Sequence, residues 1–417
     1  MRRYFGTDGV RGVVGEEITV ELVERLAKAA TLWSGRGRVF VGRDTRASGP
    51  ELEAALARGV TSAGGTAVLG GVLPTPAIAL HALDAGAAVT ASHNPPHYNG
   101  VKLFHGDGRK LTDEDEEAVE ALLETAAAST PGAVERDDTA RERYVDHVLA
   151  RFGADLAGVR LGVDCANGAF AAIAPHVFER LGADVTAIGV TPDGANINVR
   201  CGATDVRALQ QTVTSNGLDL GVAFDGDGDR MVAVDAHGRE VDGDAILAVL
   251  ALRLGVDLVV VTEMTNHAFH RLMADHGIRV VTTDVGDRYV LEALRNARGV
   301  LGGEQSGHLI YLDGHVTGDG LVAALLLLRV LEGAPLDEAT RLYVPLPQVK
   351  ENVVVGSKEL PQTLREAIDR AVAGRGRVVV RRSGTEPVVR VLAEAATEEE
   401  AAVLCGTIVA LVRRELG

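Results

Sequence analysis

Short apolar stretches alternate with longer amphipathic ones along the chain, and one arrangement occurs three times. The first copy has an apolar run at 39–42, a helical pattern at 51–64 and a second apolar run at 66–70. Similar units begin at Leu161 and Leu258, each with a glycine just before its second apolar run. Strand, helix with a C-terminal glycine, and strand form a βαβ unit. The pattern predicts three related α/β domains with parallel strands; the alternative is chance similarity among generic βαβ units.

Changes in composition divide the chain further. An acidic stretch at 107–131 is predicted to be helical and leads towards the second unit. Leu342–Val349 contains two prolines and is predicted to be a linker. Beyond it, strands and helices alternate in a smaller α+β domain. The four predicted domains cover residues 1–151, 152–243, 244–341 and 342–417.

Charge and apolar content exclude several classes of function. The chain has 42 basic and 58 acidic residues, a net charge of −16, which argues against general affinity for nucleic acid or an anionic membrane. The longest apolar runs, Ala245–Leu252 and Leu321–Leu328, are far shorter than the roughly 20 residues that a membrane span needs. Three cysteines make no disulfide framework, and the N-terminus has no apolar segment of a signal peptide. We expect a cytoplasmic protein.

A predicted strand ends in three aspartates separated by glycines. Gly221–Arg230 reads GVAFDGDGDR, with Asp225, Asp227 and Asp229 at alternate positions. Carboxylates this crowded repel one another unless they share a hard cation. The segment lacks the later glycine and glutamate of an EF-hand, so that type of site is excluded. We predict a magnesium-type site, with Arg230 placed to hold a phosphate; the alternative is a solvated acidic turn.

A serine follows another predicted strand. In Thr90–Lys102, TASHNPPHYNGVK, Ser92 lies in a loop stiffened by two prolines. A fixed, exposed hydroxyl suits a nucleophile or a phosphate carrier, with His93 as its candidate base and Lys102 to neutralise a phosphate. Most loop serines have no such role, and the GxSxG signature of hydrolases is absent.

A third motif lies in Gly302–His308, GGEQSGH. Glu304 and Ser306 are suited to hydrogen-bond neighbouring sugar hydroxyls, and His308 is suited to acid–base work. A glycine-rich turn with a surface histidine is the alternative.

The last motif is basic. Val378–Arg390, VVVRRSGTEPVVR, places Arg381 before a tight loop of hydroxyls and free backbone N–H groups, which is typical of an anion-binding nest. The alternative is a basic hairpin without a ligand. Arg11, between glycines in the N-terminal FGTDGVRG, supplies a further cation.

Four of these segments together carry a family resemblance. TASHNP, DGDGDR, GEQSGH and RRSGTEP, in this order and spacing, resemble the signatures of the α-D-phosphohexomutase superfamily. The resemblance runs from Arg3 to the C-terminus and is closest to the bacterial phosphoglucosamine mutases, through YFGTDGVRG, LGVDCANGA, PDGANINVRCG, VGDRYVLEAL and HVTGDG. It implies a heart-shaped enzyme with three related α/β domains of mixed sheets and a smaller α+β fourth domain.

The resemblance also implies residue roles. Ser92 would be the phosphoserine and would bind one Mg²⁺ together with Asp225, Asp227 and Asp229. His308 would be a candidate base. The cations beside the reacting phosphate would be Arg11, Lys102 and Arg230. The substrate-binding residues would be Glu304 and Ser306 for the sugar, Asp287 and Arg288 for the choice of sugar face, and Arg381, Ser383, Gly384 and Thr385 for the distant phosphate.

The implied reaction converts glucosamine 6-phosphate into glucosamine 1-phosphate through a 1,6-bisphosphate. Glucosamine or glucose 1,6-bisphosphate would be an activator, a hexosamine phosphate the small-molecule partner, and the assembly a homodimer. Two departures from that branch are Arg382, where it usually has proline, and residues 96–98, which are more like a phosphomannomutase/phosphoglucomutase. That enzyme, a catalytically silent sugar-phosphate-binding protein and a metal-dependent phosphatase are the alternatives.

Overall fold

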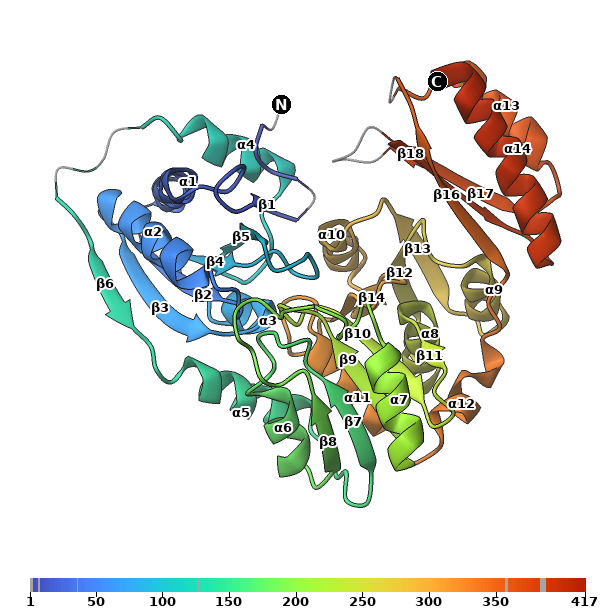
Figure 1. Cartoon of the computed structure of the whole chain (residues 1–417), viewed down its shortest axis with the longest axis horizontal. Helices are drawn as coiled ribbons and strands as arrows, with labels where there is room; N and C mark the ends of the chain where they lie inside the picture. The colour runs from blue at the N-terminus through green and yellow to red at the C-terminus, as the bar shows by residue number, and fades with distance from the viewer. Residues whose placement is uncertain are drawn as a thin grey trace.

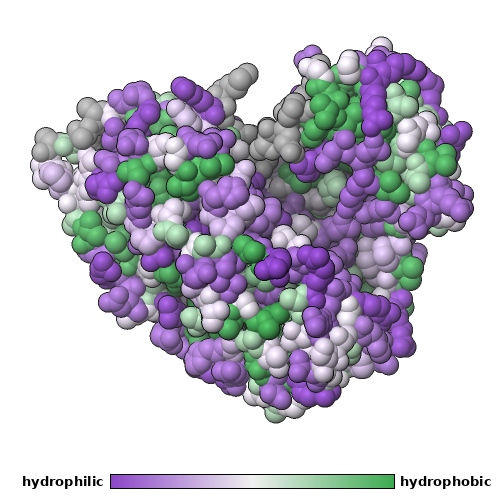
Figure 2. Space-filling model, in the orientation of Figure 1, coloured by the Kyte–Doolittle hydropathy of each residue, from purple (hydrophilic) through white to green (hydrophobic). Residues whose placement is uncertain are grey.

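The computed structural model describes residues 3–6, 8–35, 37–125, 128, 130–356, 359–382 and 388–417. Over these residues the chain forms four separate sheets, which follow one another from the N-terminal to the C-terminal end of the chain (Figure 1). The space-filling view shows a notch that is open at one edge, between the first and the fourth domain (Figure 2). The predicted α/β fold with a smaller C-terminal α+β domain is confirmed, whereas the exact domain boundaries stay predictions.

The first domain has a six-stranded sheet. Its elements are β1 (Val10–Val13), β2 (Arg38–Arg43), β3 (Thr66–Val72), β4 (Ala85–Val89), β5 (Tyr98–His105), β6 (Ala133–Arg136), α1 (Val20–Trp33), α2 (Gly49–Ser62), α3 (Thr75–Leu80) and α4 (Asp113–Ala121). The sheet order is β1-β5-β4-β2-β3-β6. The four strands β4, β2, β3 and β6 are parallel to one another, whereas β5 is antiparallel to both of its neighbours, β1 and β4. The helix predicted at 107–131 is shorter than expected, because only Glu116 and Val119 of α4 are buried and little apolar packing supports further turns.

The second and third domains repeat this arrangement. The second contains α5 (Ala140–Phe152), β7 (Arg160–Asp164), α6 (Ala174–Arg180), β8 (Asp184–Ile188), α7 (Arg207–Asn216), β9 (Leu220–Phe224), β10 (Met231–Asp235) and β11 (Glu240–Val241). The third contains α8 (Gly243–Leu254), β12 (Leu258–Thr262), α9 (His267–Asp275), β13 (Arg279–Thr283), α10 (Asp287–Ala297), β14 (Leu301–Gly303), β15 (Leu309–Tyr311), α11 (Gly320–Leu331), α12 (Leu336–Ala339) and a 3₁₀ turn (Thr340–Leu342). Their sheet orders are β11-β10-β9-β7-β8 and β13-β12-β14-β15.

Each of these three domains places its motif at the same point. The loop between β4 and β5 carries Ser92, the loop between β9 and β10 carries the three aspartates, and the loop between β14 and β15 carries GEQSGH. In every case a parallel strand is joined to the antiparallel strand beside it. The motifs therefore lie at the carboxyl ends of parallel strands, where ligand sites of open α/β sheets form.

The apolar cores show which domains pack together. One cluster of buried side chains extends through parts of the first three domains and includes almost all of α8 and α11. The fourth domain has a core of its own, formed by β16 (Gln348–Val354), α13 (Gln362–Val372), β17 (Arg377–Arg382), β18 (Val388–Glu394) and α14 (Glu398–Leu416). Among the helices that the structure describes, none is long and apolar enough to cross a membrane.

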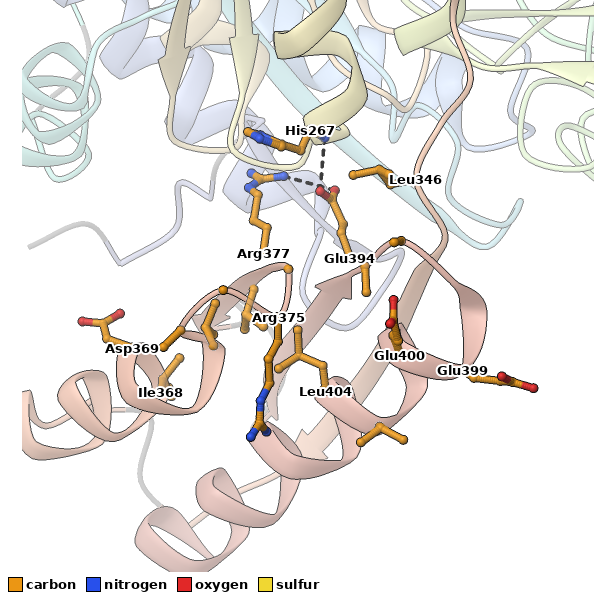
Figure 3. A pocket seen from close by; sticks show the side chains of 18 of the residues that line it. His267, Leu346, Ile368, Asp369, Arg375, Arg377, Glu394, Glu399, Glu400 and Leu404 are labelled. Carbon is orange, nitrogen blue, oxygen red and sulfur yellow. Dashed lines mark hydrogen bonds and ion pairs between the residues drawn. The ribbon is translucent and has the colours of Figure 1, made fainter.

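The fourth domain is attached by a short connection and polar contacts. Because β16 pairs with β18 from Gln348 onwards, the connection is shorter than the linker predicted at Leu342–Val349. The buried Glu394 carboxylate accepts a hydrogen bond from the His267 backbone N–H at 3.1 Å and pairs with Arg377 at 3.1 Å (Figure 3). A cavity of about 1130 Å³ beside these contacts is lined by none of the predicted site residues.

Candidate active site

The serine of the first motif lies against the aspartates of the second. Ser92 Oγ donates a hydrogen bond to Asp225 Oδ2 at 2.6 Å, although the two residues belong to different domains. The sequence predicted an exposed hydroxyl, but Ser92 is only 1% exposed, since the aspartate loop covers it. Its φ of +50° lies in the left-handed region, which is uncommon for a residue other than glycine and is typical of functional loops.

The histidine next to this serine is a poor proton acceptor. His93 Nδ1 lies 3.3 Å from Ser92 Oγ. Burial, together with the nearby Arg230 and Arg11 guanidinium groups, lowers the pKa of His93 to about 3. Its imidazole is therefore neutral near pH 7 and can orient the serine hydroxyl, but it binds a proton too weakly to suit the role of general base.

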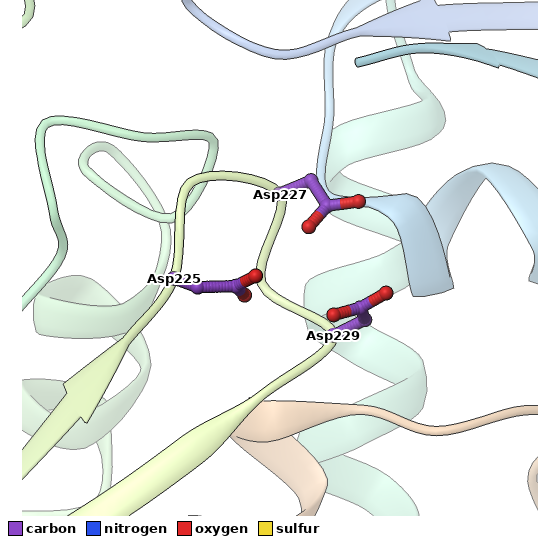
Figure 4. Close-up of side chains that lie close together, drawn as sticks. All are labelled: Asp225, Asp227 and Asp229. Carbon is purple, nitrogen blue, oxygen red and sulfur yellow. The ribbon is translucent and has the colours of Figure 1, made fainter. Parts of the chain in front are cut away.

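The three aspartates form a buried cluster at the tip of the β9–β10 loop (Figure 4). One oxygen atom of each of Asp225, Asp227 and Asp229 lies within 4.8 Å of those of the other two. Burial and repulsion from the other two carboxylates raise the pKa of Asp225 well above its ordinary value. Asp227 Oδ1 and Asp229 Oδ1 are buried without a hydrogen-bond partner in the described structure. Hard oxygen ligands with unused lone pairs fit a divalent cation.

Lys102 partly balances this negative charge. Its Nζ lies 2.9 Å from a carboxylate oxygen of Asp8, of Asp227 and of Asp229, and the side chain is 3% exposed. Burial alone would lower the pKa of Lys102, but the three carboxylates outweigh it and raise that pKa well above its ordinary value. The ammonium is therefore charged, at a position where a phosphoryl group on Ser92 would meet it.

The third motif joins the same network through its histidine. His308 Nε2 lies 3.1 Å from Asp287 Oδ2, and Nδ1 lies 3.6 Å from Asp229 Oδ1. Burial disfavours the charged imidazole, but Asp287 and Asp229 outweigh it and raise the pKa of His308 to about 10. Lys110 continues the chain of charges, with Nζ 2.5 Å from Asp287 and 2.6 Å from Asp8. A charged His308 can donate a proton, and its predicted role as a base stays a prediction.

The remaining predicted cations also lie beside this centre. Arg11 Nη1 is 3.9 Å from Asp8 Oδ2, and Arg230 Nε is 4.0 Å from Asp229 Oδ1. The backbone N–H of Arg230 donates to Asp225 at 3.2 Å. Because Arg230 Nε is buried without a hydrogen-bond partner in the described structure, the guanidinium has capacity left for an anionic ligand.

The predicted substrate residues lie around this centre in different environments. Glu304 is buried and accepts a hydrogen bond from the Gly286 backbone N–H at 3.1 Å, whereas Ser306 is exposed. Arg381 has its pKa lowered by burial and by Arg390, while Glu304 is among the carboxylates that stabilise its charge across the domain boundary. The predicted Ser383, Gly384 and Thr385 lie outside the described residues.

Asp287 and Arg288 were both predicted to distinguish the two faces of the sugar, but their side chains have different partners in the structure. Asp287 points into the charged network, as described above for His308. Arg288 instead pairs with Asp113 and, at 3.1 Å, with Glu116 of α4, while its guanidinium lies over the Tyr289 ring. In this conformation Arg288 joins the third domain to the first.

Three residues of the network had not been predicted from the sequence. Asp8 and Lys110 connect the cations and carboxylates already described, and Thr75 donates its hydroxyl to Asp227 at 2.6 Å. Asp8 lies inside the FGTDGVRG motif, which could have drawn attention to it. Thr75 and Lys110 stand in unremarkable surroundings in the sequence, so only the tertiary structure reveals them.

A serine hydroxyl lies among cations and clustered carboxylates where three domains meet, an arrangement that is suited to phosphoryl transfer. Family models agree. The models for domains I, II and III of phosphoglucomutase/phosphomannomutase match residues 2–130, 142–238 and 242–345, and the C-terminal domain model matches 332–411. The chain belongs to the phosphoglucomutase/phosphomannomutase family, which confirms the resemblance inferred from the motifs.

Individual proteins that are similar to this chain give a more specific comparison than the family models. The phosphoglucosamine mutase of Moorella thermoacetica is 46% identical, and the alignment covers 96% of this chain and 97% of that protein. A phosphoglucomutase/phosphomannomutase family protein from Burkholderia thailandensis has a TM-score of 0.85 at 23% identity, over 99% of this chain and 98% of that one. Aspergillus fumigatus N-acetylphosphoglucosamine mutase, in complex with GlcNAc-6P and magnesium, has a TM-score of 0.74 at 21% identity, over 99% and 96% of the two chains. At these identities the two structures show a shared fold.

Proposed function

We propose that this protein is a phosphoglucosamine mutase, which interconverts glucosamine 6-phosphate and glucosamine 1-phosphate. The observation that carries the proposal is the 2.6 Å contact between Ser92 Oγ and Asp225, inside a cluster that also holds Lys102. The relatives with that name, 41–46% identical over nearly the whole chain, support the choice of sugar.

The reaction passes the phosphoryl group through the serine. The bond between phosphorus and Ser92 Oγ breaks as a bond to the free hydroxyl of glucosamine 6-phosphate forms, which gives a 1,6-bisphosphate. The bisphosphate turns over in the cleft, and Ser92 Oγ takes the phosphoryl group from the 6-position. In the first step the sugar hydroxyl loses a proton and Ser92 Oγ takes one up. In the last step the Ser92 hydroxyl loses a proton and the sugar oxygen that is left takes one up. His308, protonated between Asp229 and Asp287, is suited to supply that proton, and it would accept one in the reverse reaction.

Charge around the serine is arranged for this transfer. Lys102, Arg11 and Arg230 bring three positive charges to the groups that surround Ser92 Oγ. We propose that Asp225, Asp227, Asp229 and the Ser92 oxygen hold one Mg²⁺. When bound, this ion would neutralise charge on the transferring phosphoryl group. The two buried carboxylate oxygens that lack a hydrogen-bond partner in the described structure, Asp227 Oδ1 and Asp229 Oδ1, support this assignment.

The substrate would be held away from the serine by the third and fourth domains. We propose that Glu304 and Ser306 bind the sugar, and that Arg381 with Ser383, Gly384 and Thr385 binds the phosphate that does not react. The Glu304 carboxylate is among the groups that favour the charged form of Arg381, which supports a ligand reached from both domains. Glucosamine or glucose 1,6-bisphosphate would activate the enzyme, which would work in the cytoplasm. It would form a homodimer, and light scattering of the purified protein would test this oligomeric state.

Turnover on three substrates tests the function. We expect glucosamine 6-phosphate to be converted faster than glucose or mannose 6-phosphate in side-by-side assays, with no release of inorganic phosphate. Intact-mass analysis should find one phosphate on the wild type and none on Ser92→Ala, which should also lose nearly all turnover. Faster conversion of mannose or glucose phosphate would favour the phosphomannomutase/phosphoglucomutase alternative. An active enzyme that never carries phosphate would rule out the serine mechanism.

A further inference from the structure

A buried arginine of the first domain holds the serine loop from behind. The Arg46 guanidinium is fully buried and donates all five of its N–H groups. Nη2 donates to the carbonyl oxygens of Ser92 and Asn94, both at 2.8 Å, and Nη1 donates to those of Pro95 and Tyr98 at 2.5 and 3.0 Å. Nε donates to the Asp44 carboxylate at 2.9 Å. A lysine has three donors and no fork, so it could not hold these carbonyl groups together.

An asparagine of the second domain reaches the same carbonyl groups. Asn198 Nδ2 donates to the Ser92 oxygen at 2.9 Å and to the Asn94 oxygen at 3.2 Å. Asn198 has a φ of +58°, which asparagine tolerates better than most residues. It belongs to the segment PDGANINVRCG, for which the catalytic mechanism gives no role. The carbonyl of Ser92 is thus held by one side chain from each of two domains.

The N–H of the same serine is also fixed. Ser92 N–H donates to Thr90 Oγ1 at 2.9 Å, and Thr90 Oγ1 donates to the Asp44 carboxylate at 2.7 Å. The same carboxylate accepts the Nε–H of Arg46. The buried ion pair between Arg46 and Asp44 therefore helps to hold both the N–H and the carbonyl group of Ser92. A left-handed backbone at a serine persists only where the surroundings over-determine it. That backbone conformation directs Oγ at Asp225.

The aspartate loop packs against this arrangement. A Cβ atom at Gly226 would lie 2.8 Å from both the Ser92 carbonyl oxygen and Asn198 Nδ2. Glycine is therefore needed at this position, between two of the aspartates, so that the metal loop can approach the serine loop. The position of the serine relative to the aspartates is consequently set by contacts to the backbone of the serine loop.

We propose that Arg46 and Asn198 are positioning residues for phosphoryl transfer, which together hold Ser92 in its left-handed conformation against the aspartate cluster. This inference rests on the proposed mutase function. Both side chains act on the backbone of the serine loop, whereas sugar phosphate would be bound by the third and fourth domains. Loss of either residue should slow both transfer steps and leave substrate affinity nearly unchanged.

The decisive variant is Asn198→Gly, because glycine adopts the same left-handed backbone without strain and removes only the side chain. Arg200→Gly is its matched control: Arg200 lies in the same loop, has a φ of +56° and is exposed. Enzyme that carries ³²P-labelled phosphate on Ser92 is mixed with unlabelled glucosamine 6-phosphate and quenched on the millisecond scale, and the label transferred from Ser92 to the sugar phosphate is measured. Affinity is measured by titrating glucosamine 6-phosphate into dephosphorylated enzyme.

For Asn198→Gly we expect the transfer rate constant to fall by between about tenfold and about 100-fold, the penalty of a small misplacement of a reacting group. Substrate affinity should stay within about twofold, and Arg200→Gly should match the wild type. Arg46→Lys should show the same pattern if it folds. An unchanged transfer rate in Asn198→Gly, or an equal loss of affinity and rate, would overturn the proposal. If the wild type transfers no phosphate from Ser92, the proposed function fails instead, and the two failures are distinguishable.

Discussion

Replacing Lys102 with methionine tests the charge balance of the site. The methionine keeps much of the side-chain volume and removes the ammonium that lies 2.9 Å from Asp8, Asp227 and Asp229. Removal of one partner from a buried ion pair typically costs about 3–5 kcal/mol, because the remaining charge is uncompensated. At about 2–4 °C per kcal/mol for a domain of this size, the melting temperature in EDTA should fall by roughly 10 °C.

Magnesium should reverse part of this loss. A ligand at a free concentration of about 100 times its dissociation constant stabilises the folded protein by about 2.7 kcal/mol. Because the variant has one positive charge fewer beside the aspartates, it should bind Mg²⁺ more tightly and gain more melting temperature from it than the wild type does. Turnover should nevertheless stay at least about 100-fold below the wild type, since the transferring phosphoryl group has lost a fixed cation.

The assay is differential scanning fluorimetry of both proteins in EDTA and over a Mg²⁺ titration, with coupled turnover measured in parallel. Lys28→Met is the matched control, because Lys28 on α1 has no ion-pair partner among the described residues. The reasoning is wrong if Lys102→Met melts within about 2 °C of the wild type in EDTA, or if Mg²⁺ shifts both proteins equally.

Three further substitutions test other parts of the molecule. Asp227→Ala should abolish Mg²⁺-dependent turnover while circular dichroism stays native, and unchanged metal dependence would contradict the metal assignment. Arg381→Ala should cost about 1.5–3 kcal/mol of substrate binding, seen as a higher KM and a smaller fall in kcat, whereas unaltered kinetics would place the phosphate elsewhere. Burial raises the pKa of Asp244 to about 7, so this folded carboxyl ionises at higher pH than the unfolded one, and stability is lost as pH rises from about 4 to about 7. Asp244→Asn should therefore stabilise the protein at pH 8 but not at pH 4 in thermal melts, and an equal effect at both pH values would refute this.

Local pattern determined the fold class and the types of chemistry. The alternation of apolar and amphipathic stretches located β2, α2 and β3 closely, because burial of one face imposes that periodicity on the sequence itself. The aspartate spacing also predicted a cluster of ligands, because three carboxylates within five residues cannot lie far apart. The order of four motifs then identified the family.

Tertiary structure decided which groups meet and in which protonation state. Lys102 and Asp227 are 125 residues apart, and no local pattern predicts that they touch. Burial and neighbouring charge, which depend on three domains at once, keep His93 neutral and His308 protonated, although both are ordinary histidines in the sequence. The burial of Ser92 and the hydrogen bonds from Arg46 and Asn198 to its carbonyl oxygen also depend on the tertiary structure. Side chains from distant segments surround a backbone conformation that the serine would seldom adopt alone.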